Sequence, residues 1–480
     1  MFNTAGGPYS RAVETFPRDP SFYEHCSLGL ARDFDLKVST QRINLALSGA
    51  FCLAAKTRSV YLWAGLTVAD TALAPYRMLD LTNERGLLCG KIFADLGADV
   101  IKIEPPGGDR ARDISPFYQD ARGPEKSLFW WAFNTGKKSI TLNLETADGR
   151  QILRRLVKTA DFLVESFDPG YLDGLGIGYT VLHESNQRLI MGSITPFGQS
   201  GPYAQWKGPD IVPWAMSGYM WMTGESGRAP LRVCPPQAYL HASATTAAGL
   251  LVALRYRHAT GKGQHVDTSA QQCPTWMLTH TYAYWDLLKV NLGRAGVLRH
   301  FGERFLKTVW HCKDGYITFM FAGGLIGAKG QRQVVELMDE AGMAEEWLKR
   351  FNWEDWSAGT GSQEEVDRIS EAFGRYFKAK TKAELLDEAI RHDIMLAPVN
   401  TIADMAANPQ LKDRDYWVEV AHPELGAVIT YPGAPCKLTE TPWHIEGRAP
   451  LIGEHNTDIY EQELGFSRAE IAAMKDARTI

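Results

Sequence analysis

Short apolar runs and helical stripes follow one another in the first half of the chain. The run Arg77–Thr82 is apolar enough for a buried strand, and Leu88, Ile92 and Leu96 recur at the four-residue step of one helix face. The apolar run Ala98–Glu104 predicts the next strand. A strand, a helix and a strand within about thirty residues form a βαβ unit, whose two strands are parallel.

The same succession recurs further along the chain. More strands are predicted at Ser139–Leu144, Asp161–Val164, Leu189–Ile194 and Gln264–Thr268. Helices are predicted by the apolar stripe Ile152–Val157 and by the alanine-rich run Ala242–Arg257. We therefore expect an α/β fold with an open, Rossmann-like sheet.

The pattern changes after this series of strands. Residues 275–301 are aromatic and helical without a strand, which indicates a segment that crosses between domains. Residues 309–321 and 369–405 predict a second, α+β unit with charged amphipathic helices. The tail from Val418 has short strands interrupted by prolines and a final helix at 468–477.

Composition and charge narrow the class of protein. The 480 residues, 45% hydrophobic and 22% charged, are those of an ordinary globular chain with room for two or three domains. A net charge of −5 without a long basic run argues against nucleic acid and anionic membranes as partners.

The N-terminal region and the cysteines indicate where the protein works. The apolar stretch Leu45–Ala55 is shorter than the about 20 residues that span a membrane. The segment after Met1 lacks the basic start and apolar run of a secretory signal, and residues 1–70 stay an unassigned extension because they have no usable period. The 7 cysteines contain no Cys-x-x-Cys, which predicts neither a disulfide framework nor a zinc site. We expect a cytoplasmic protein.

Several strings in this framework resemble the family III CoA-transferases. They are Ala94–Asp109 (ADLGADVIKIEPPGGD), Phe133–Leu144 (FNTGKKSITLNL), Ser193–Pro202 (SITPFGQSGP) and Gly261–Asp267 (GKGQHVD), followed in the family's order by Ala397–Leu411, His422–Gly426, Glu440–Trp443 and Gly453–Asn456. The resemblance covers about residues 77–465. The family includes formyl-CoA transferase, carnitine CoA-transferase and α-methylacyl-CoA racemase.

The resemblance implies a Rossmann-like large domain, built from the first and last parts of the chain, with a small α+β domain inserted between them. We therefore expect the first part of the large domain at 71–270, a linker at 271–300, the small domain at 301–415 and a return segment at 416–480. Two such ring-like subunits are expected to thread through each other as an interlocked dimer.

The reaction implied by the resemblance moves CoA from an acyl-CoA thioester to a carboxylic acid. A carboxylate of the enzyme attacks the thioester to give a mixed anhydride, and the released CoA thiolate then attacks the enzyme's own carbonyl carbon. The result is an aspartyl-CoA thioester. CoA is thus part of the substrate, and neither a covalently bound cofactor nor a metal is expected.

The nucleophile of the family is missing from this chain. In the family the nucleophilic Asp stands at the start of a long helix, ahead of a recognisable motif. In this chain that motif is Gly249-Leu-Leu, followed by Arg257–Gln264. Counting back ten residues from Gly249 puts Tyr239 in the position of the nucleophilic Asp. No Asp or Glu stands from Ser226 to Val266. A phenol with an ordinary pKa near 10 cannot form the mixed anhydride. We expect no catalytic residue here, with Tyr239 in the nucleophile position and His241 nearby.

The CoA contacts that the resemblance implies are altered as well. The positions that line the CoA cleft are occupied by Lys207, Leu142, Ser166 and Phe167. Basic residues common in the family are replaced by Pro105, Asp168 and Gly174. Asp168 puts a negative charge where phosphates would approach, and each lost charge-assisted contact should cost about 1.5–3 kcal/mol. The racemase branch also needs a His before Asp210, where Pro209 stands.

Other residues have a chemical and an ordinary interpretation. Arg110, Arg112, Lys137 and Lys138 could touch a phosphate, although exposed loop charge is the common explanation. His311-Cys312 could belong to a metal site or simply to a strand. The glycines Gly323, Gly324, Gly327 and Gly330 form either an active-site loop or a connection. Pro105–Gly108 is a turn and not a Gly-x-Gly-x-x-Gly fingerprint, so no nicotinamide cofactor is indicated.

Three functional hypotheses follow. The first is the non-catalytic subunit of a heteromeric family III CoA-transferase, whose Asp-bearing paralogous subunit supplies the nucleophile. The second is an acyl-CoA isomerase or lyase that uses Tyr239 and His241 for proton transfer. The third is a binding or regulatory pseudoenzyme. The sequence leaves the acyl donor and the acceptor acid open.

Overall fold

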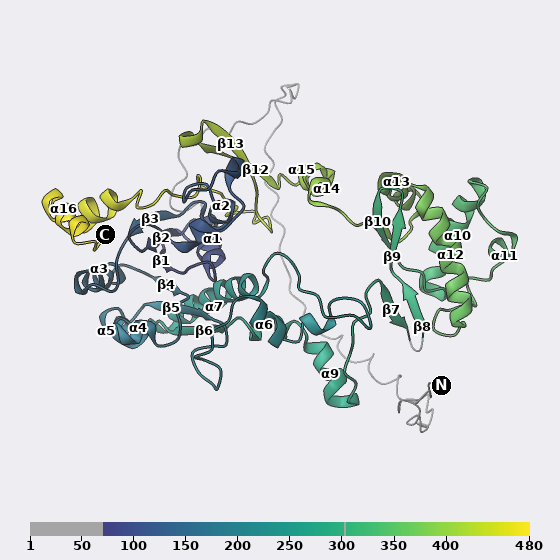
Figure 1. Ribbon diagram of the computed structural model, residues 1–480, viewed down its shortest axis with the longest axis horizontal. Helices are drawn as coiled ribbons and strands as arrows, with labels where there is room; N and C mark the ends of the chain where they lie inside the picture. The colour runs from purple at the N-terminus through teal and green to yellow at the C-terminus, as the bar shows by residue number, and fades with distance from the viewer. Residues whose placement is uncertain (1–70, 302–303) are drawn as a thin grey trace, which may run out of the picture. The chain divides into compact units, whose positions relative to one another are not determined.

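Six parallel strands form one sheet in the computed structural model, which describes residues 71–301 and 304–480 (Figure 1). The strands are β1 (Arg77–Leu81), β2 (Asp99–Glu104), β3 (Lys138–Thr141), β4 (Phe162–Glu165), β5 (Ile190–Thr195) and β6 (His265–Ser269). Their order is β3-β2-β1-β4-β5-β6, and every neighbouring pair is parallel. This is the doubly wound order of Rossmann-like folds, so the predicted α/β fold class is confirmed.

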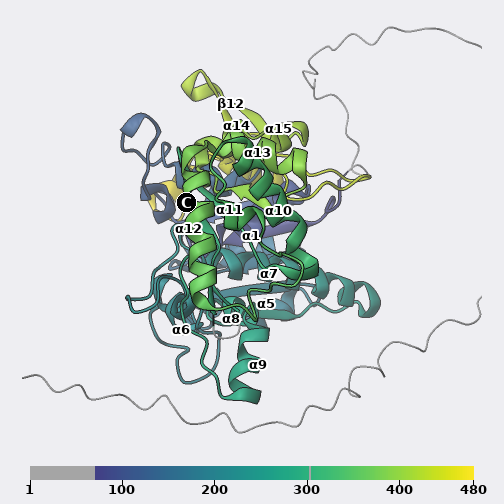
Figure 2. The ribbon, with the colours of Figure 1, turned by 90° about the vertical axis from the view of Figure 1, so that its right-hand side faces the viewer.

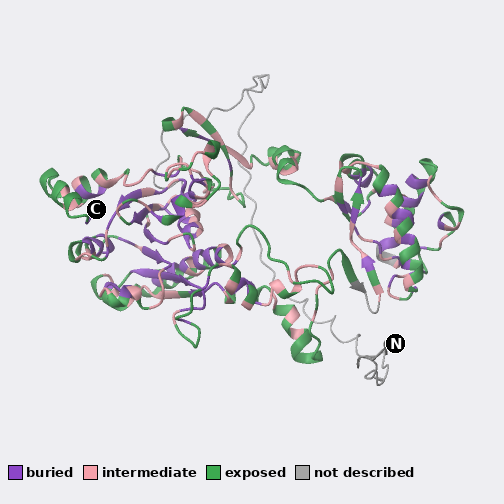
Figure 3. Cartoon of the chain, in the orientation of Figure 1, coloured by how far each residue is buried: buried purple, intermediate pink, exposed green. Residues whose placement is uncertain are grey.

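Both faces of this sheet are covered, and its inner strands β4 and β5 are buried along their whole length (Figure 3). On one face Met78 and Val100 pack with residues of α1 (Leu87–Asp95) and α7 (Ala238–Thr260). On the other face, the chain neighbours Leu79 and Ile101 pack with α3 (Ala147–Val157). The division follows from the two-residue period of side chains along a strand.

Helix α7 is the predicted alanine-rich helix, extended at both ends. Its first turn is capped from a distant loop, because the carboxylate of Asp210 accepts hydrogen bonds from the N–H groups of Gln237 and Tyr239 at 3.2 and 3.1 Å. The helix lies close to β5, where a Cβ added to Gly192 would come within 2.9 Å of Cγ2 of Thr246. Small residues therefore set the approach of this helix to the sheet.

The C-terminal segment returns to the edge strand β3. It contains the antiparallel hairpin of β12 (Trp417–His422) and β13 (Ala427–Pro432), then the π-helix η6 (Thr457–Glu463) and α16 (Arg468–Asp476). Its side chains satisfy the edge of the sheet, because the N–H of Ser139 donates to Nδ1 of His455 at 3.1 Å and that of Thr141 to Oδ1 of Asn456 at 3.0 Å. The hydroxyl of Tyr460 donates to the carbonyl of Thr141 at 2.6 Å.

A second, antiparallel sheet has its own core. Its strands are β9 (Val309–Cys312), β10 (Gly315–Phe319) and β11 (Leu396–Pro398), in the order β11-β10-β9. Four helices group beside it (Figure 1): α10 (Gly324–Glu340), α11 (Glu346–Lys349), α12 (Gln363–Ala379) and α13 (Lys382–His392). Figure 2 shows this part of the chain facing the viewer. Trp310, Phe319 and Phe373 are buried in this core. The α+β arrangement is the one that the pattern of this part of the chain predicts.

The remaining elements are short. Before α7 they are η2 (Arg110–Asp113), η3 (Tyr118–Asp120), α2 (Leu128–Asn134), α4 (Tyr171–Gly174), α5 (Tyr179–Ser185), α6 (Ile211–Met216) and η4 (Met220–Met222). After β6 they are α8 (Gln272–Trp276), α9 (Thr279–Leu288), β7 (Leu298–Phe301), β8 (Arg304–Lys307), α14 (Ile402–Ala407), α15 (Pro409–Asp413) and η5 (Pro423–Leu425).

Two local predictions were wrong. Residues 275–301 end in strand β7, which pairs with β8 as an antiparallel hairpin, although a helical segment without a strand was expected. Gly327 and Gly330 lie inside α10 and not in a loop, whereas Gly323 and Gly324, with positive φ values of 67° and 59°, are the N-cap and the first residue of this helix. The apolar residues further along α10 that pack into its core continue the helix through these glycines.

The sequence predicted no membrane-spanning segment. No helix within 71–301 and 304–480 is both long and apolar enough to span a bilayer. The interpretation of residues 1–70 as an unassigned extension, with Leu45–Ala55 in it, lies outside the described residues.

Candidate functional site

The strand order places a candidate site at the carboxyl edge of the sheet between β1 and β4. The order reverses there, and open α/β sheets bind ligands beyond the carboxyl ends of their strands at this switch point. The two loops that leave these strands are tied together. Ser166 Oγ accepts a hydrogen bond from the N–H of Asn83 and donates one to Asn83 Oδ1, both at 2.9 Å. We call these two loops, with Lys207 and Tyr239, the switch-point site.

Three charged side chains meet in the switch-point site. Lys207 donates a hydrogen bond to Oδ2 of Asp168, and Nη1 of Arg85 lies 3.5 Å from Oδ1 of the same carboxylate. The hydrogen bond from Lys207, with the charges of Lys207 and Arg85, lowers the pKa of Asp168 below its ordinary value. Asp168 is therefore an anion at neutral pH, and it faces the two cations of the site.

Tyr239 lies at the start of α7 and is buried. Its hydroxyl donates a hydrogen bond to the carbonyl of Gly208, and the guanidinium of Arg85 lies 5.7 Å from the centre of its ring. Burial raises the pKa of the Tyr239 hydroxyl far above its ordinary value. The phenol therefore stays protonated at neutral pH, with its proton committed to the backbone.

His241 does not join Tyr239. The two residues are separated by about 200° around the helix axis, since each residue of an α-helix turns the chain by about 100°. The ring of His241 lies beside that of Trp214, with 6.0 Å between their centres. Tyr239 and His241 are close in the sequence, but their side chains lie on different faces of α7.

The carboxylates around Tyr239 are already engaged. Asp210 accepts the two N–H bonds that cap α7, and Asp168 is paired with its cations. Glu165, the last residue of β4, is buried and accepts a hydrogen bond from the N–H of Phe167 at 2.7 Å. Burial raises the pKa of Glu165 to about 7. Each of these carboxylates has a structural partner that a nucleophile would have to give up.

Polar residues that the sequence analysis missed continue from Glu165 across the sheet. Glu165 is in register with Ser193 of β5, and the hydroxyl of Ser193 lies 2.8 Å from Nε2 of His265 in β6. The ring of His265 stacks on Tyr179 at 5.2 Å, and burial lowers the pKa of His265. The sequence alone carried no signal for this set, because the register that brings Glu165 next to Ser193 depends on pairing between strands far apart in the chain.

The predicted CoA contacts fall into two groups. Ser166 and Lys207 belong to the switch-point site, and Phe167 lies beside them with its ring 4.7 Å from that of Tyr171. Leu142, in contrast, is buried in the core on one face of the sheet, at 2% exposure. Its side chain packs with the apolar residues of the core and not with the charged residues of the site.

Two of the four predicted loop cations are buried, so the expectation of exposed charge was wrong for them. Lys137 donates to Oδ2 of Asp80 at 2.8 Å, and Arg112 donates to Glu104 at 2.7 Å. Their side chains are held by these carboxylates and cannot reach a ligand phosphate. Arg110 is exposed, and the half-exposed Lys138 is paired with Asp99 at 2.7 Å.

His311 and Cys312 lie in strand β9, as the ordinary interpretation of this pair predicts. The ring of His311 packs on that of Tyr316 at 4.5 Å, and Cys312 is buried. Among the residues that the structure describes, no three His, Cys, Asp or Glu side chains gather in a way that could hold a metal ion.

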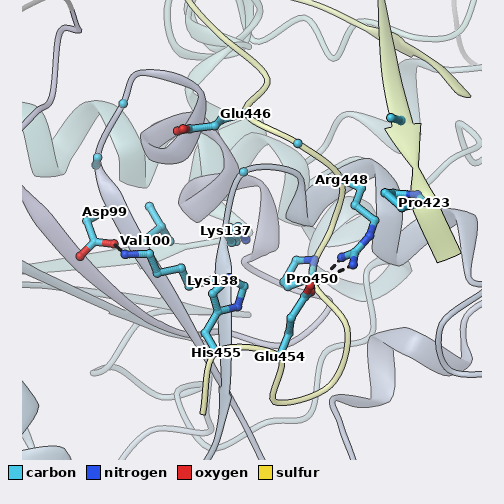
Figure 4. Close-up of a pocket in the computed structure, with 15 residues that line it drawn as sticks. Asp99, Val100, Lys137, Lys138, Pro423, Glu446, Arg448, Pro450, Glu454 and His455 are labelled. Atoms are coloured by element: carbon cyan, nitrogen blue, oxygen red, sulfur yellow. Dashed lines mark hydrogen bonds and ion pairs between the residues drawn. The ribbon is translucent and has the colours of Figure 1, made fainter. Parts of the chain in front are cut away.

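A cavity of about 640 Å³ opens at the opposite edge of the sheet, where β2 and β3 begin (Figure 4). Two ion pairs line it, because Lys138 pairs with Asp99 and Arg448 pairs with Glu454 at 2.8 Å. His455 lines it and bonds to the N–H of Ser139. The cavity is thus formed by the return segment over the amino ends of β2 and β3. Lys137 and Lys138 line it, whereas the residues of the switch-point site do not.

Comparisons with known proteins agree with this architecture. The sequence profile of CoA-transferase family III matches residues 73–456. The succinyl-CoA:(R)-benzylsuccinate CoA-transferase subunit BbsE of Thauera aromatica is 38% identical, over 82% of this chain and 95% of that protein. The succinyl-CoA:mesaconate CoA-transferase of Haloarcula marismortui is 31% identical, over 83% of this chain and 99% of that protein. The crystal structure of a CAIB/BAIF family protein from Brucella suis superposes with a TM-score of 0.71 at 28% identity, covering 82% of this chain and 99% of that chain.

Proposed function

The chain belongs to CoA-transferase family III, and from that premise we propose that it is the subunit of a heteromeric CoA-transferase that lacks the nucleophile. The complex moves CoA from an acyl-CoA donor to a carboxylic acid. A second family III chain, with an Asp where this chain has Tyr239, supplies the covalent step. The relative from Thauera aromatica is itself a subunit of a CoA-transferase.

The state of Tyr239 carries this proposal. In the family reaction a carboxylate of the enzyme attacks the acyl-CoA carbonyl, releases CoA thiolate and forms a mixed anhydride. The thiolate then attacks the carbonyl carbon of the enzyme's carboxyl group in this anhydride and releases the donor acid. A tyrosine has no such carbonyl carbon, so CoA could not be held on it even if the acyl group were. The hydroxyl of Tyr239 is in addition buried, protonated and bonded to Gly208.

The neighbouring carboxylates support the same conclusion. Asp210 would have to leave the N–H groups of Gln237 and Tyr239, which would uncap α7. Asp168 would have to leave Lys207 and Arg85. Glu165 is buried behind the loop that it holds through Phe167. We infer that none of them takes the place of the missing Asp.

Exposed apolar side chains support an assembly with another chain. Trp276 of α8 and Tyr282 and Leu287 of α9 are 70%, 66% and 77% exposed. Large apolar side chains gathered on neighbouring helices mark an interaction surface in a soluble protein. In an interlocked dimer of the kind that the family resemblance implies, the Asp-bearing chain covers them.

The other two hypotheses have less support. An isomerase or lyase would need Tyr239 and His241 to act on one substrate, but they are turned away from each other and the phenol is committed to a carbonyl. A pseudoenzyme would have the same inactive site that we propose for this subunit. The two hypotheses differ only in whether this chain binds a transferase subunit. We place the complex in the cytoplasm, in keeping with the buried free thiols Cys89, Cys273 and Cys312.

The test is reconstitution with the Asp-bearing paralogue. The two chains are purified separately and coexpressed, and transfer from succinyl-CoA to (R)-benzylsuccinate, mesaconate and a series of other acids is measured. We expect turnover by the coexpressed pair, its loss when the paralogue's nucleophilic Asp is changed to Asn, and its retention with Tyr239→Phe in this chain. Turnover by this chain alone would refute the proposal, and failure of the chains to copurify would favour the pseudoenzyme.

A further inference from the structure

We infer that Asp168 occupies, as part of the protein, the position of a ligand phosphate between Lys207 and Arg85, and so keeps CoA out of this subunit. The inference rests on the proposed function, because it explains how one subunit of a CoA-transferase is left empty. It assigns Asp168 as the residue that sets this specificity, and it assigns Lys207 with Arg85 as a latent anion site.

The position of the three residues is the first argument. Asp168 follows β4 by three residues and Arg85 follows β1 by four, so both lie at the carboxyl edge beside the switch point. Phosphates of nucleotides bind at this edge in doubly wound sheets. Lys207 reaches the same place from the segment between β5 and α6. Three separate parts of the chain therefore converge where a phosphate would bind.

The contacts reproduce those of a bound anion. Lys207 takes one oxygen of the Asp168 carboxylate and Arg85 takes the other. A lysine and an arginine that address different oxygens of one anion form the usual pattern of phosphate recognition. Asp168 is held as an anion by this arrangement, and a ligand phosphate would have to displace it against the repulsion of two negative charges.

The exposure of the residues argues against a purely structural role. The side chains of Lys207 and Asp168 are 75% and 45% exposed, and that of Arg85 is 20% exposed. Exposed ion pairs contribute little to the stability of a fold. The fold therefore does not depend on Asp168, and the two cations remain reachable for a ligand once this carboxylate is neutral.

The loop that carries Lys207 also contacts Tyr239. Gly208, the residue after Lys207, accepts the hydrogen bond of the Tyr239 hydroxyl. Gln205 Nε2 donates to the carbonyl of Pro169, the residue after Asp168, at 3.4 Å. The loop that carries Lys207 is thus fastened both to the Asp168 loop and to the start of α7. The carboxylate and the tyrosine close the site together.

The test measures binding of CoA and of inorganic pyrophosphate to the purified full chain by isothermal titration calorimetry. The variants are Asp168→Asn, Asp168→Ala, the double variant Asp168→Asn/Lys207→Ala, and Asp173→Asn as the matched control. The control removes one negative charge from α4 without changing the Asp168 carboxylate. Circular dichroism melts confirm that each variant is folded.

We expect both Asp168 variants to bind CoA and pyrophosphate at least about tenfold more tightly than the wild type, since two cations lose their internal partner. The double variant should lose this gain, and Asp173→Asn should not show it. No gain in the Asp168 variants, an equal gain in Asp173→Asn, or a gain that survives Lys207→Ala would each overturn the inference.

The binding experiment and the reconstitution experiment can fail separately. If the pair of chains is active only together but Asp168→Asn does not gain binding, the proposed function stands and the inference about Asp168 fails. If this chain alone turns over substrate, the proposed function fails whatever Asp168→Asn does.

Discussion

The hydroxyl of Tyr239 donates a hydrogen bond to the carbonyl of Gly208, and this bond joins the first turn of α7 to the loop that carries Lys207. The guanidinium of Arg85 lies over the ring on the side of the switch point. Tyr239 is thus a fixed part of the framework at the start of α7. Its contribution should be measurable as stability and not as catalysis.

Replacing Tyr239 by Phe should separate these two roles. The carbonyl of Gly208 loses its donor while it stays buried, which costs about 1–3 kcal/mol in the free energy of unfolding. If the proposed function is right, the phenol takes no part in the reaction, and the transferase activity of the coexpressed pair should stay within about twofold. Denaturant titration and initial rates measure the two effects. A large loss of kcat in a variant of unchanged stability would contradict this role.

Glu165 should make stability depend on pH near neutrality. Its pKa is raised by burial to about 7 in the folded chain from an ordinary value of 4.5. The folded chain therefore holds this proton more tightly, so the contribution of Glu165 to stability is greatest below pH 4.5 and is lost as the pH rises to about 7. The change is about 3 kcal/mol from the size of the shift.

The variant Glu165→Gln isolates this contribution, because the amide oxygen can still accept the N–H of Phe167. The difference in the free energy of unfolding between Glu165→Gln and the wild type should grow in favour of the variant from pH 5 to pH 8. Denaturation curves across this range measure it. A difference that stays flat would mean that Glu165 is ionised at pH 5 in the folded chain.

The adjacent residues Lys137 and Lys138 should respond very differently to the same substitution. Lys137→Met leaves the buried carboxylate of Asp80 without its main cation, which should cost about 3–5 kcal/mol. Lys138→Met removes a half-exposed pair with Asp99 and should cost less than about 1 kcal/mol. Thermal and chemical denaturation of the two variants make the comparison. If Lys137→Met lowers the free energy of unfolding as little as Lys138→Met does, the ionised Asp80 does not depend on Lys137.

Gly192 should be needed for the approach of α7 to the sheet. In Gly192→Ala the added methyl group would lie 2.9 Å from Cγ2 of Thr246 and 3.2 Å from Cδ2 of Leu250, so α7 must shift, at about 1–3 kcal/mol. Gly174→Ala is the matched control, since nothing lies within 4 Å of the added methyl group in α4. The control should be neutral or slightly stabilising. Destabilisation by both would point to a cause other than crowding.

The central strands of the main sheet could be found in the sequence because they are short, largely apolar runs, as in Phe162–Glu165 and Ile190–Thr195. Their lateral order could not be found in this way, because it depends on contacts between segments far apart in the chain. The alternation of predicted strands and helices supplied the expectation of a Rossmann-like sheet, and the resemblance to a family agreed with it. The register that brings Glu165 next to Ser193 then followed only from the structure.

The candidate site was predictable in part. Tyr239, Lys207 and Asp168 were singled out from motif positions, and the structure brings them into one neighbourhood. Arg85 was missed because nothing in its surroundings distinguishes it from a surface arginine. The burial of Lys137 was missed for a related reason, since the next residue is also lysine and only the fold decides which of them faces Asp80.

The way in which the return segment satisfies β3 has a consequence for biosynthesis. Ser139 and His455 are bonded across 316 residues of chain, so the ribosome makes the edge strand long before the side chains that cover it. Until then the edge of the nascent sheet presents open N–H and carbonyl groups, which attract other strands. Residues His455 to Tyr460 must therefore emerge before this edge is covered, and a chain truncated before His455 should aggregate or bind chaperones more than the full chain.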